Sequence, residues 1–423
     1  MVKEKMDALV PTEKQPYSVP ENWKWVPLLN SFNNRTDSKK KIKQNDYLID
    51  GKIAIIDQGQ EIVGGYTNDD EMKYEGELPV IIFGDHTRRI KYIDFPFVQG
   101  ADGVKVLVSK SFLLPKAFFY ALTNIDIPNM GYRRHFPLFK NFCIPVPPIP
   151  EQYRIVDRIE SLFAKLDEAK EKAQVVVDGF EERKAAVLHQ AFEGKLTEQW
   201  RQENAVARTQ WALVQLKDVC SINPSKINTK GLADDLEVSF FPMTALSEVS
   251  GEITEPQTKK LSEVKSGFTN FSEGDVVFAK ITPCMENGKS AVVGSLVNGI
   301  GYGTTEFFVM RCGEKLYNRY LWHMIRARAF RDMAKAEMTG AVGQQRVPKS
   351  YLDNYQFELP PVEEQYAIVR LLDATIDKEL QVKLIAEQVI SQIETMKKAI
   401  LARAFRGELG TNDPTEPPIV VGG

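Results

Sequence analysis

Basic, amide and hydroxyl side chains gather at four places in the sequence. They are His86, Thr87, Arg88, Arg89 and Lys91; Arg133 and Arg134; Lys280, Thr282, Asn287 and Lys289; and Gln344, Gln345 and Arg346. Arg can pair in a bidentate manner with guanine, and Asn or Gln can do so with adenine. Lys, Arg and hydroxyl groups hold phosphates. These side chains are therefore candidates for binding a nucleic acid, either by reading base edges or by holding phosphates.

Other interpretations of the basic residues stay open at this level. Arg133 and Arg346 could instead form structural salt bridges to a nearby glutamate, Glu151 or Glu364. The basic run KKKIK at 39–43 could be a solvated loop. Three further arginines at helical spacing would form an ordinary polar helix face or contact phosphates: Arg326, Arg328 and Arg331.

Bulk composition limits the class of protein. The 423 residues carry 43% hydrophobic and 26% charged side chains, as a globular protein with two or more domains does. No apolar run reaches the ~18 residues of a membrane span, and the charged N-terminus does not resemble a secretory signal, so we expect a cytoplasmic protein. The net charge of −3 means that any DNA-binding surface must be a local patch.

The sequence offers no convincing catalytic or metal-binding motif. The four cysteines are far apart, and no Cys/His cluster with metal-ligand spacing occurs. The segment ENGKS at 286–290 lacks the leading glycine of a phosphate-binding loop, because Pro283 stands at that position. We therefore expect no catalytic residue, no metal and no cofactor on this chain.

A long internal repeat organises the chain. PPIPEQYRIV begins at Pro147, and PPVEEQYAIV begins at Pro360, 213 residues later. The same offset aligns Gly194 with Gly407 without a gap. One period of this length, seen twice, is a duplicated half-molecule and not a solenoid, whose repeats are about 20–50 residues long.

Both repeated segments are predicted to be long helices. In the first copy, apolar residues recur in steps of four and three: Ile155, Ile159, Leu162, Leu166, Ala169, Ala173, Val176 and Phe180. This heptad seam predicts that the two helices pack together as an antiparallel coiled coil. The alternative is two separate helices, each buried in its own domain. Gly194 and Gly407 are expected C-caps, and Gly179 is expected to mark a bend.

The regions between the helices contain short apolar runs and turn residues, which predict an α+β fold. The fold class is thus α+β, with two globular recognition domains separated by two long helices and related by a pseudo-twofold repeat. The expected boundaries are 1–149 for the first recognition domain, 150–199 for the first spacer helix, 200–361 for the second domain, 362–410 for the second helix and 411–423 for a flexible C-terminal tail.

This arrangement resembles the specificity subunit of type I restriction-modification enzymes, a host-defence system. The resemblance rests on the two helix starts, the helix ends AFEGKL and AFRGEL, the tail ELGTNDPTEPP and, in the heads, FGDHTR and GDVVFAKITPCMENGK. It implies two target recognition domains that each read half of a split site in double-stranded DNA. It also implies docking of two adenine-N6 methyltransferase subunits and two ATP-dependent restriction subunits, with S-adenosylmethionine, ATP and magnesium on those partners.

Two other functions remain to be distinguished from DNA recognition: a coiled-coil protein adaptor that binds no DNA, and an enzyme with an unrecognised active site in a head. The DNA hypothesis has a geometric consequence. Residues 151–178, if helical, would span about 42 Å at ~1.5 Å per residue. That length corresponds to about 12 base pairs of duplex, so the helices are predicted to act as a ruler between two half-sites.

Overall fold

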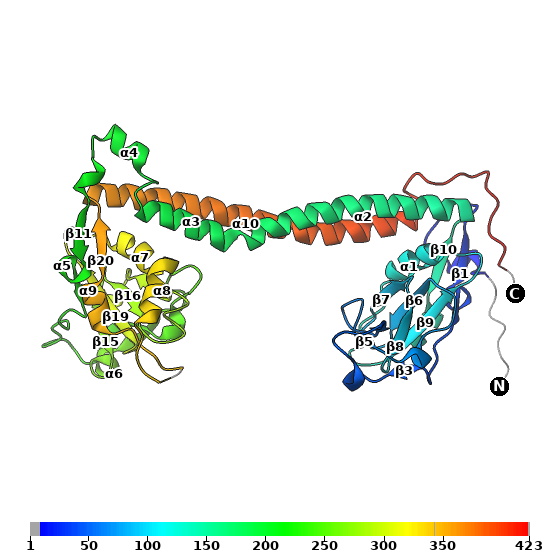
Figure 1. Ribbon diagram of the computed structural model, residues 1–423, viewed down its shortest axis with the longest axis horizontal. Helices are drawn as coiled ribbons and strands as arrows, with labels where there is room; N and C mark the ends of the chain where they lie inside the picture. The colour runs from blue at the N-terminus through cyan, green and yellow to red at the C-terminus, as the bar shows by residue number, and fades with distance from the viewer. Residues whose placement is uncertain (1–8, 342, 422–423) are drawn as a thin grey trace. The chain divides into compact units, whose positions relative to one another are not determined.

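The computed structural model describes residues 9–341 and 343–421. The chain divides into two compact units, one of Met1–Gln174 with Glu387–Gly423 (unit 1) and one of Val175–Ala386 (unit 2). Each unit combines a β-rich head with a stretch of the long helices (Figure 1). Among the described residues, no helix has the length and apolar character needed to cross a membrane.

Head 1, residues 20–146, contains two four-stranded sheets and one short two-stranded sheet. The first sheet has the order β2 (Phe32–Asn34), β9 (Val104–Ser109), β6 (Val80–Gly84) and β7 (Ile90–Ile93). The second has the order β3 (Lys41–Ile42), β8 (Phe97–Gly100), β4 (Ile53–Ile56) and β5 (Gly65–Thr67). Strands β1 (Lys24–Pro27) and β10 (Cys143–Val146) pair with each other, and helix α1 spans Pro115–Thr123.

Head 2, residues 211–359, has the same set of sheets. The first is β12 (Cys220–Ile222), β19 (Phe307–Cys312), β16 (Val276–Ala279) and β17 (Ser290–Val292). The second is β14 (Gln257–Lys260), β13 (Glu237–Phe241), β18 (Ile300–Gly303) and β15 (Thr269–Ser272). The short pair is β11 (Ala212–Gln215) with β20 (Gln356–Leu359). Its helices are α5 (Leu216–Val219), α6 (Leu261–Val264), α7 (Asn318–Arg326), α8 (Arg328–Ala336) and α9 (Lys349–Asn354), and α4 (Glu198–Glu203) precedes the head.

The central strands β6 and β16 of the first sheets are buried along their whole length. Strand β6 carries the run VIIFG, and all five of its residues are buried. Strand β16 carries VVFA, and all four are buried. Continuous apolar runs of this kind are expected where a strand is covered on both faces. The expected α+β fold of each head is confirmed.

The first sheets of the two heads have the same strand order, but the second sheets differ at one edge. The first sheets correspond strand for strand, and so do the parallel pairs β4–β8 and β13–β18 in the second sheets. At the outer edge, however, β3 lies parallel to β8, whereas β15 lies antiparallel to β18. The two heads therefore share one scaffold whose periphery has diverged.

The repeated sequence segments form long helices. Helix α2 spans Ile149–Asp178, α3 spans Phe180–Phe192 and α10 spans Val362–Ala404. Gly179 separates α2 from α3, at the position where a bend was predicted. Short 3-10 helices complete the secondary structure: Thr12–Lys14, Leu28–Asn30, Gln44–Asp46, Asp70–Met72, Phe136–Asn141, Arg208–Gln210, Met243–Ala245 and Val297–Gly299.

The helices pack antiparallel within each unit. Figure 1 shows α2 beside the C-terminal part of α10. Lys397 Nζ lies 2.5 Å from Asp167 Oδ1, and Lys170 Nζ lies 2.6 Å from Glu394 Oε1. The residue number rises along α2 while it falls along α10, as an antiparallel pair requires. In unit 2, Arg183 Nε of α3 donates to Glu379 Oε2 of α10 at 2.6 Å. The predicted antiparallel pairing is confirmed, and the alternative of two unpaired helices is wrong.

Both long helices end at the glycines predicted as C-caps. Gly194 and Gly407 have φ of 78° and 75°, in the left-handed region that glycine tolerates best. Lys195 N donates to Gln190 O, and Glu408 N donates to Arg403 O. These 6→1 bonds define Schellman motifs, so the same local sequence stops both helices.

Candidate nucleic-acid interface

In head 1, the structure brings together two clusters that are about 45 residues apart in the sequence. The turn after β6 lies against the segment that precedes β10. His86 Nδ1 lies 3.2 Å from Tyr132 O, and the two rings stack with centroids 4.9 Å apart. His135 N donates to Asp85 O at 2.8 Å, and Asp85 Oδ1 accepts from Phe136 N at 2.7 Å. Buried Asp85 therefore holds the two candidate loops in one place.

The candidate DNA-contacting residues of head 1 differ in their exposure to solvent. Thr87, Arg89, Arg133 and Arg134 are exposed, and His86 is half-buried. Arg88 is half-buried with φ of 60°, and its Nη1 donates to Ile127 O at 2.9 Å, so part of its role is to fix the turn. The exposed residues remain candidates for DNA contact.

Lys91 corrects the sequence-based assignment. Its side chain is only 5% exposed, and its ammonium contacts Asp57 and two backbone carbonyls, those of Glu61 and Ile62. Burial lowers the pKa of Lys91, although the neighbouring Asp57 carboxylate opposes that shift. An ammonium that is buried and already bonded cannot serve as a surface phosphate contact, so Lys91 stabilises the fold of head 1.

In head 2, the corresponding two clusters also meet. Thr282 N donates to Gln345 O at 3.0 Å, and Ile281 forms a β-bridge with Arg346. The loop after β16 thus lies against the segment that precedes α9 and β20. This is the same place in the topology as the paired loops of head 1, after the buried central strand of the first sheet.

The candidate DNA-contacting residues of head 2 differ in their exposure and in their hydrogen bonds to the protein. Asn287 is exposed but donates to Glu248 Oε2 at 3.0 Å, and Gln344 is exposed. Lys289 Nζ donates to Met243 O at 3.2 Å. The other three candidates, Lys280, Thr282 and Gln345, are half-buried. The Lys280 ammonium lies 5.5 Å from the centroid of the Phe308 ring, and the Thr282 hydroxyl lies 3.3 Å from Gln345 O.

The two repeat-matched arginines have different environments. Arg133 is exposed, whereas Arg346 forms a bidentate salt bridge in which both donor–acceptor distances to Glu306 are 2.9 Å. The hydrogen bond from Arg346 lowers the pKa of Glu306. A salt bridge was the alternative interpretation of Arg346, but its partner is Glu306 and not the helix-opening Glu364. The interpretation of equal roles for the two arginines is not supported by this geometry.

Two arginines left open between a polar helix face and phosphate contact have another role. Arg326 donates to three backbone oxygens, those of Gly288, Glu248 and Val249, at 2.8–3.0 Å. Burial, with help from the charge of Arg331, lowers the pKa of Arg326 to about 10. Arg331 donates to Glu286 O. Both arginines therefore stabilise the backbone of the candidate loop 280–289. The helical spacing of these arginines in the sequence could not reveal this role.

Tyr132 is a functional candidate that the search for basic residues missed. The residue is 87% exposed while its ring stacks on that of His86. An exposed ring supported from one side by another ring, with two exposed arginines after it, can stack on a base or cover a sugar. Its sequence signal was the aromatic residue within GYRRH. The basic run at 39–43 is partly neutralised, since Lys40 and Lys41 pair with Glu75 and Asp102.

The repeated glutamates explain why the helix starts are duplicated. Trp23 Nε1 donates to Glu151 Oε2 at 2.7 Å, and Trp211 Nε1 donates to Glu364 Oε2 at 2.8 Å. All four side chains are buried. Each bond ties the first turn of a long helix to the residue that begins its head. The helix-opening glutamates thus accept from tryptophans, and Arg346 pairs with Glu306 instead of Glu364.

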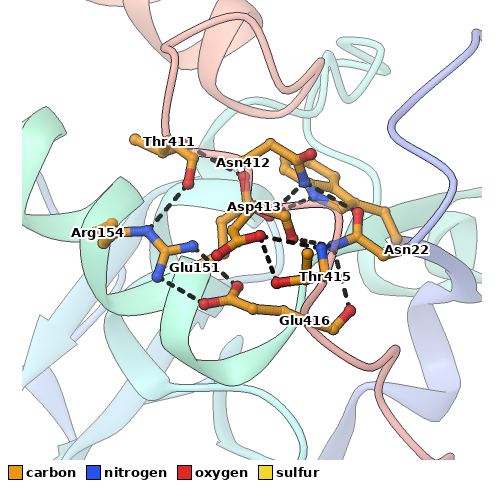
Figure 2. Close-up of polar contacts among 9 residues, drawn as sticks. Asn22, Glu151, Arg154, Thr411, Asn412, Asp413, Thr415 and Glu416 are labelled. Atoms are coloured by element: carbon orange, nitrogen blue, oxygen red, sulfur yellow. Dashed lines mark hydrogen bonds and ion pairs between the residues drawn. The ribbon is translucent and has the colours of Figure 1, made fainter.

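The segment after each helix closes on the glutamate of the other repeat. Thr197 Oγ1 and Arg201 Nη1, after α3, both donate to Glu364 Oε1 at 2.7 Å. In unit 1, Thr411 Oγ1 and Asn412 Nδ2, after α10, donate to Glu151 at 3.2 and 2.9 Å. Figure 2 shows these side chains together.

The expectation of a flexible tail from residue 411 onward disagrees with these contacts. Arg154 forms a bidentate pair with Glu416 at 2.8 Å, and Asn22 Nδ2 donates to Asp413 O at 2.9 Å (Figure 2). The stretch 411–416 has no helix or strand, but side chains from head 1 and α2 hold it in place.

Comparisons with known proteins agree with this architecture. The family described as type I restriction modification DNA specificity domain matches residues 20–176 and 209–395. The specificity subunits of the type I restriction enzymes EcoEI and EcoAI of Escherichia coli are 39% and 40% identical over 160 residues. These alignments cover 38% of this chain but only 26% and 27% of those proteins, so the chain spans about a quarter of their length. The EcoBI specificity subunit is 20% identical over 93% of this chain and 85% of its own length.

Two solved structures share the fold. The HsdS subunit from Thermoanaerobacter tengcongensis superposes with a TM-score of 0.56 at 20% identity, covering 93% of this chain and 99% of that one. A chain from a structure on complex assembly and conformational transition of the type I R-M system superposes with a TM-score of 0.63 at 19% identity, covering 93% and 100%. Since the family match covers most of both heads, the chain belongs to the family of type I restriction-modification DNA specificity proteins.

Proposed function

We propose that this chain is the DNA-recognition subunit of a type I restriction-modification complex and reads one half of a split site with each head. The observation that carries the proposal is the pair of equivalent loop clusters. In each head, the loop after the buried central strand meets the segment before the last strand, and basic or amide side chains converge there. Such side chains are the ones that read base edges and hold phosphates.

Divergence between the clusters supports two different half-sites. Head 1 presents exposed Tyr132, Arg133 and Arg134. Head 2 presents Asn287 and Gln344, with its arginines engaged by the protein itself. Arginine favours guanine and an amide favours adenine, so the same scaffold would select different bases in the two heads.

The long helices are the proposed docking surface for partner subunits. In unit 1, α2 and α10 border an open groove of about 310 Å³, lined by Leu162, Lys165, Leu166, Met396, Ala399, Ile400 and Arg403. Met396 in this groove is 49% exposed. Two helices bury only part of an apolar seam, and further helices laid into this groove would cover the rest.

The proposed partners are two adenine-N6 methyltransferase subunits and two ATP-dependent restriction subunits, which would carry S-adenosylmethionine, ATP and magnesium. In this assignment the chain itself performs no chemistry, resides in the cytoplasm and contacts no membrane. Its contribution is to hold double-stranded DNA in a fixed register for the catalytic subunits.

The first prediction tests this division of labour. The purified chain alone is expected to transfer no methyl group from S-adenosylmethionine to DNA, whereas addition of the methyltransferase subunits should produce methylated adenines in both halves of a split site. Long-read sequencing of the methylated DNA would identify the site. Methyl transfer by the chain alone would instead identify an enzyme with an active site in a head.

Salt dependence separates DNA recognition from a protein adaptor. A reader that neutralises Z phosphates loses affinity with a slope of about −0.9Z in a plot of log K against log salt concentration. We expect a steep slope for the full chain on duplex DNA containing the site. A chain that binds its partner subunits normally, but binds DNA neither specifically nor in a salt-dependent way, would be an adaptor.

Replacing the two repeat-matched arginines, Arg133 and Arg346, is expected to have different effects. Arg133→Ala should weaken DNA binding without changing thermal stability, by about 1–3 kcal/mol if Arg133 pairs with a base. If it contacts a phosphate, the salt slope should flatten by about one unit. Arg346→Ala should instead lower the melting temperature, because it removes the bidentate partner of Glu306.

Binding titrations and thermal melts of both variants would check this contrast. Arg328→Ala is a matched control, since Arg328 is exposed on α8 and pairs with Asp332 within its own helix, at 3.5 Å. Equal losses of affinity from Arg133→Ala and Arg346→Ala, with unchanged melting, would restore equal roles for the two positions.

A further inference from the structure

Each head is fastened to its long helix by the same two-point contact. The first point is a glutamine that follows the helix-opening glutamate. Gln152 accepts from Leu114 N and donates to Phe112 O and Pro147 O, and Gln365 accepts from Tyr317 N and donates to Lys315 O and Pro360 O, all at 2.8–2.9 Å. These bonds fix the loop that leads into α1 or α7. The start of the head helix is therefore positioned identically in both units.

The second point lies two turns further along the long helix. In unit 1, Lys116 of α1 donates to Glu160 of α2 at 2.5 Å. Tyr120, one turn later on α1, also faces Glu160: burial, and then the charge of Glu160 and a hydrogen bond to it, raise the pKa of Tyr120 to about 12. A carboxylate of the long helix thus holds two successive turns of the head helix.

Unit 2 repeats this arrangement with different chemistry. Arg319 Nη2 of α7 donates to both oxygens of Asp373 of α10, at 3.1 and 3.0 Å. His323, one turn later, places Nε2 2.8 Å from Asp373 Oδ1. Arg319 and His323 occupy the places of Lys116 and Tyr120 relative to the glutamine contact. The titratable imidazole therefore stands where unit 1 has a phenol.

We infer that the Asp373 contact with Arg319 and His323 is an acid-labile clamp that sets the position of head 2 on its helix, while the equivalent clamp of head 1 is insensitive to pH in the same range. Asp373, Arg319 and His323 are thus positioning residues for the half-site that head 2 reads. That last consequence rests on the proposed function, whereas the clamp itself does not.

The environment of His323 determines the direction in which its pKa is shifted. Its side chain is 5% exposed. In the described part of the chain, the charged groups that act on the ring are Asp373 of α10 and, from its own helix, Arg319 and Arg326. On α3, which packs against α7, Glu181 and Lys184 act on Arg326. Burial lowers the pKa of His323, and the two arginines add to the shift against the opposing effect of Asp373.

The sign of the pH effect follows by linkage. A histidine whose pKa is lowered in the folded state holds its proton less tightly there than in an open state. Neutral His323 donates its Nε2 proton to the carboxylate, and the clamp is closed at neutral pH. As the pH falls below the ordinary histidine pKa of about 6.5, protonation favours the open, solvated imidazole. One proton shifts this equilibrium by at most about tenfold per pH unit.

Hydrogen–deuterium exchange of the full chain tests the clamp directly. Peptides covering α7 and α1 would be compared at pH 7.5 and 5.5, after correction for the intrinsic pH dependence of exchange. We expect the protection of α7 to fall by up to about tenfold relative to that of α1. His323→Gln keeps a neutral donor to Asp373 and should abolish this difference, and His323→Tyr, which copies Tyr120, should do the same.

Two results would overturn the inference: parallel loss of protection in α1 and α7 of the wild type, or an acid-induced loss in α7 that persists in His323→Gln. The DNA arm uses duplexes with single-base changes in each half of the methylated site. Wild type should lose up to tenfold discrimination at one half-site only at pH 5.5, and His323→Gln should retain it. Absence of DNA binding at both pH values would refute the proposed function, while the exchange experiment would still decide the clamp.

Discussion

Replacing Glu364 with alanine is expected to destabilise unit 2 by about 3–5 kcal/mol, the usual cost of removing one partner of a buried ion pair. Glu364 is fully buried, and the Arg201 side chain is only 11% exposed. Loss of the carboxylate leaves the Arg201 guanidinium and the Trp211 indole N–H without their acceptor. Urea unfolding of the full chain, followed by tryptophan fluorescence, would measure the loss.

Two matched variants sharpen this test. Glu363→Ala changes the exposed neighbour in the same helical turn and should have little effect. Glu151→Ala removes the equivalent residue of unit 1, which accepts from three neutral donors within the described residues: Trp23, Thr411 and Asn412. Unpaired neutral groups cost about 1–3 kcal/mol. A Glu364→Ala protein as stable as Glu363→Ala would show that the carboxylate does not hold the helix start to head 2.

Lengthening both helices by one heptad is expected to widen the gap between the two half-sites while their sequences stay unchanged. Seven residues add about 10 Å of helix, or roughly three base pairs of duplex, if the helices set the spacing. The ion pairs Asp167–Lys397 and Lys170–Glu394 identify facing positions. Insertions after Glu168 and after Thr395 fall between these pairs, so a heptad in each keeps the seam in register.

Methylome sequencing of cells that carry the partner subunits and this variant would read the new gap. The same seven residues inserted after Glu168 alone provide the control, because the facing residues of α10 would then be out of step and methylation should be lost. An unchanged gap in a doubly lengthened protein that still methylates would mean that the helices do not determine the spacing.

The sequence by itself determined the features that depend on local or periodic patterns. The repeat at Pro147 and Pro360, the break at Gly179 and the caps at Gly194 and Gly407 all appear in the structure where they were predicted, whereas Ala169 of the predicted heptad seam is exposed. Each is encoded by residues within a few turns of one another, because helix periodicity and capping act over short sequence distances. The architecture of α+β heads joined to paired helices follows from these signals.

Tertiary structure alone decided which polar residues are available and what they bind. Arg89 and Lys91 are two residues apart, yet one is exposed and the other is buried against Asp57. Arg346 is engaged by Glu306, 40 residues away, while its repeat partner Arg133 is exposed.

The repeated glutamates and the tail show the same limit at longer range. Glu151 meets Trp23 and Asn412, which lie 128 and 261 residues away in the sequence. A side chain's partner is set by which strands and helices the fold places beside it, and no local pattern contains that information. The sequence could therefore identify the groups capable of recognition, whereas the packing of each head determined which of them face solvent and which hold the fold together.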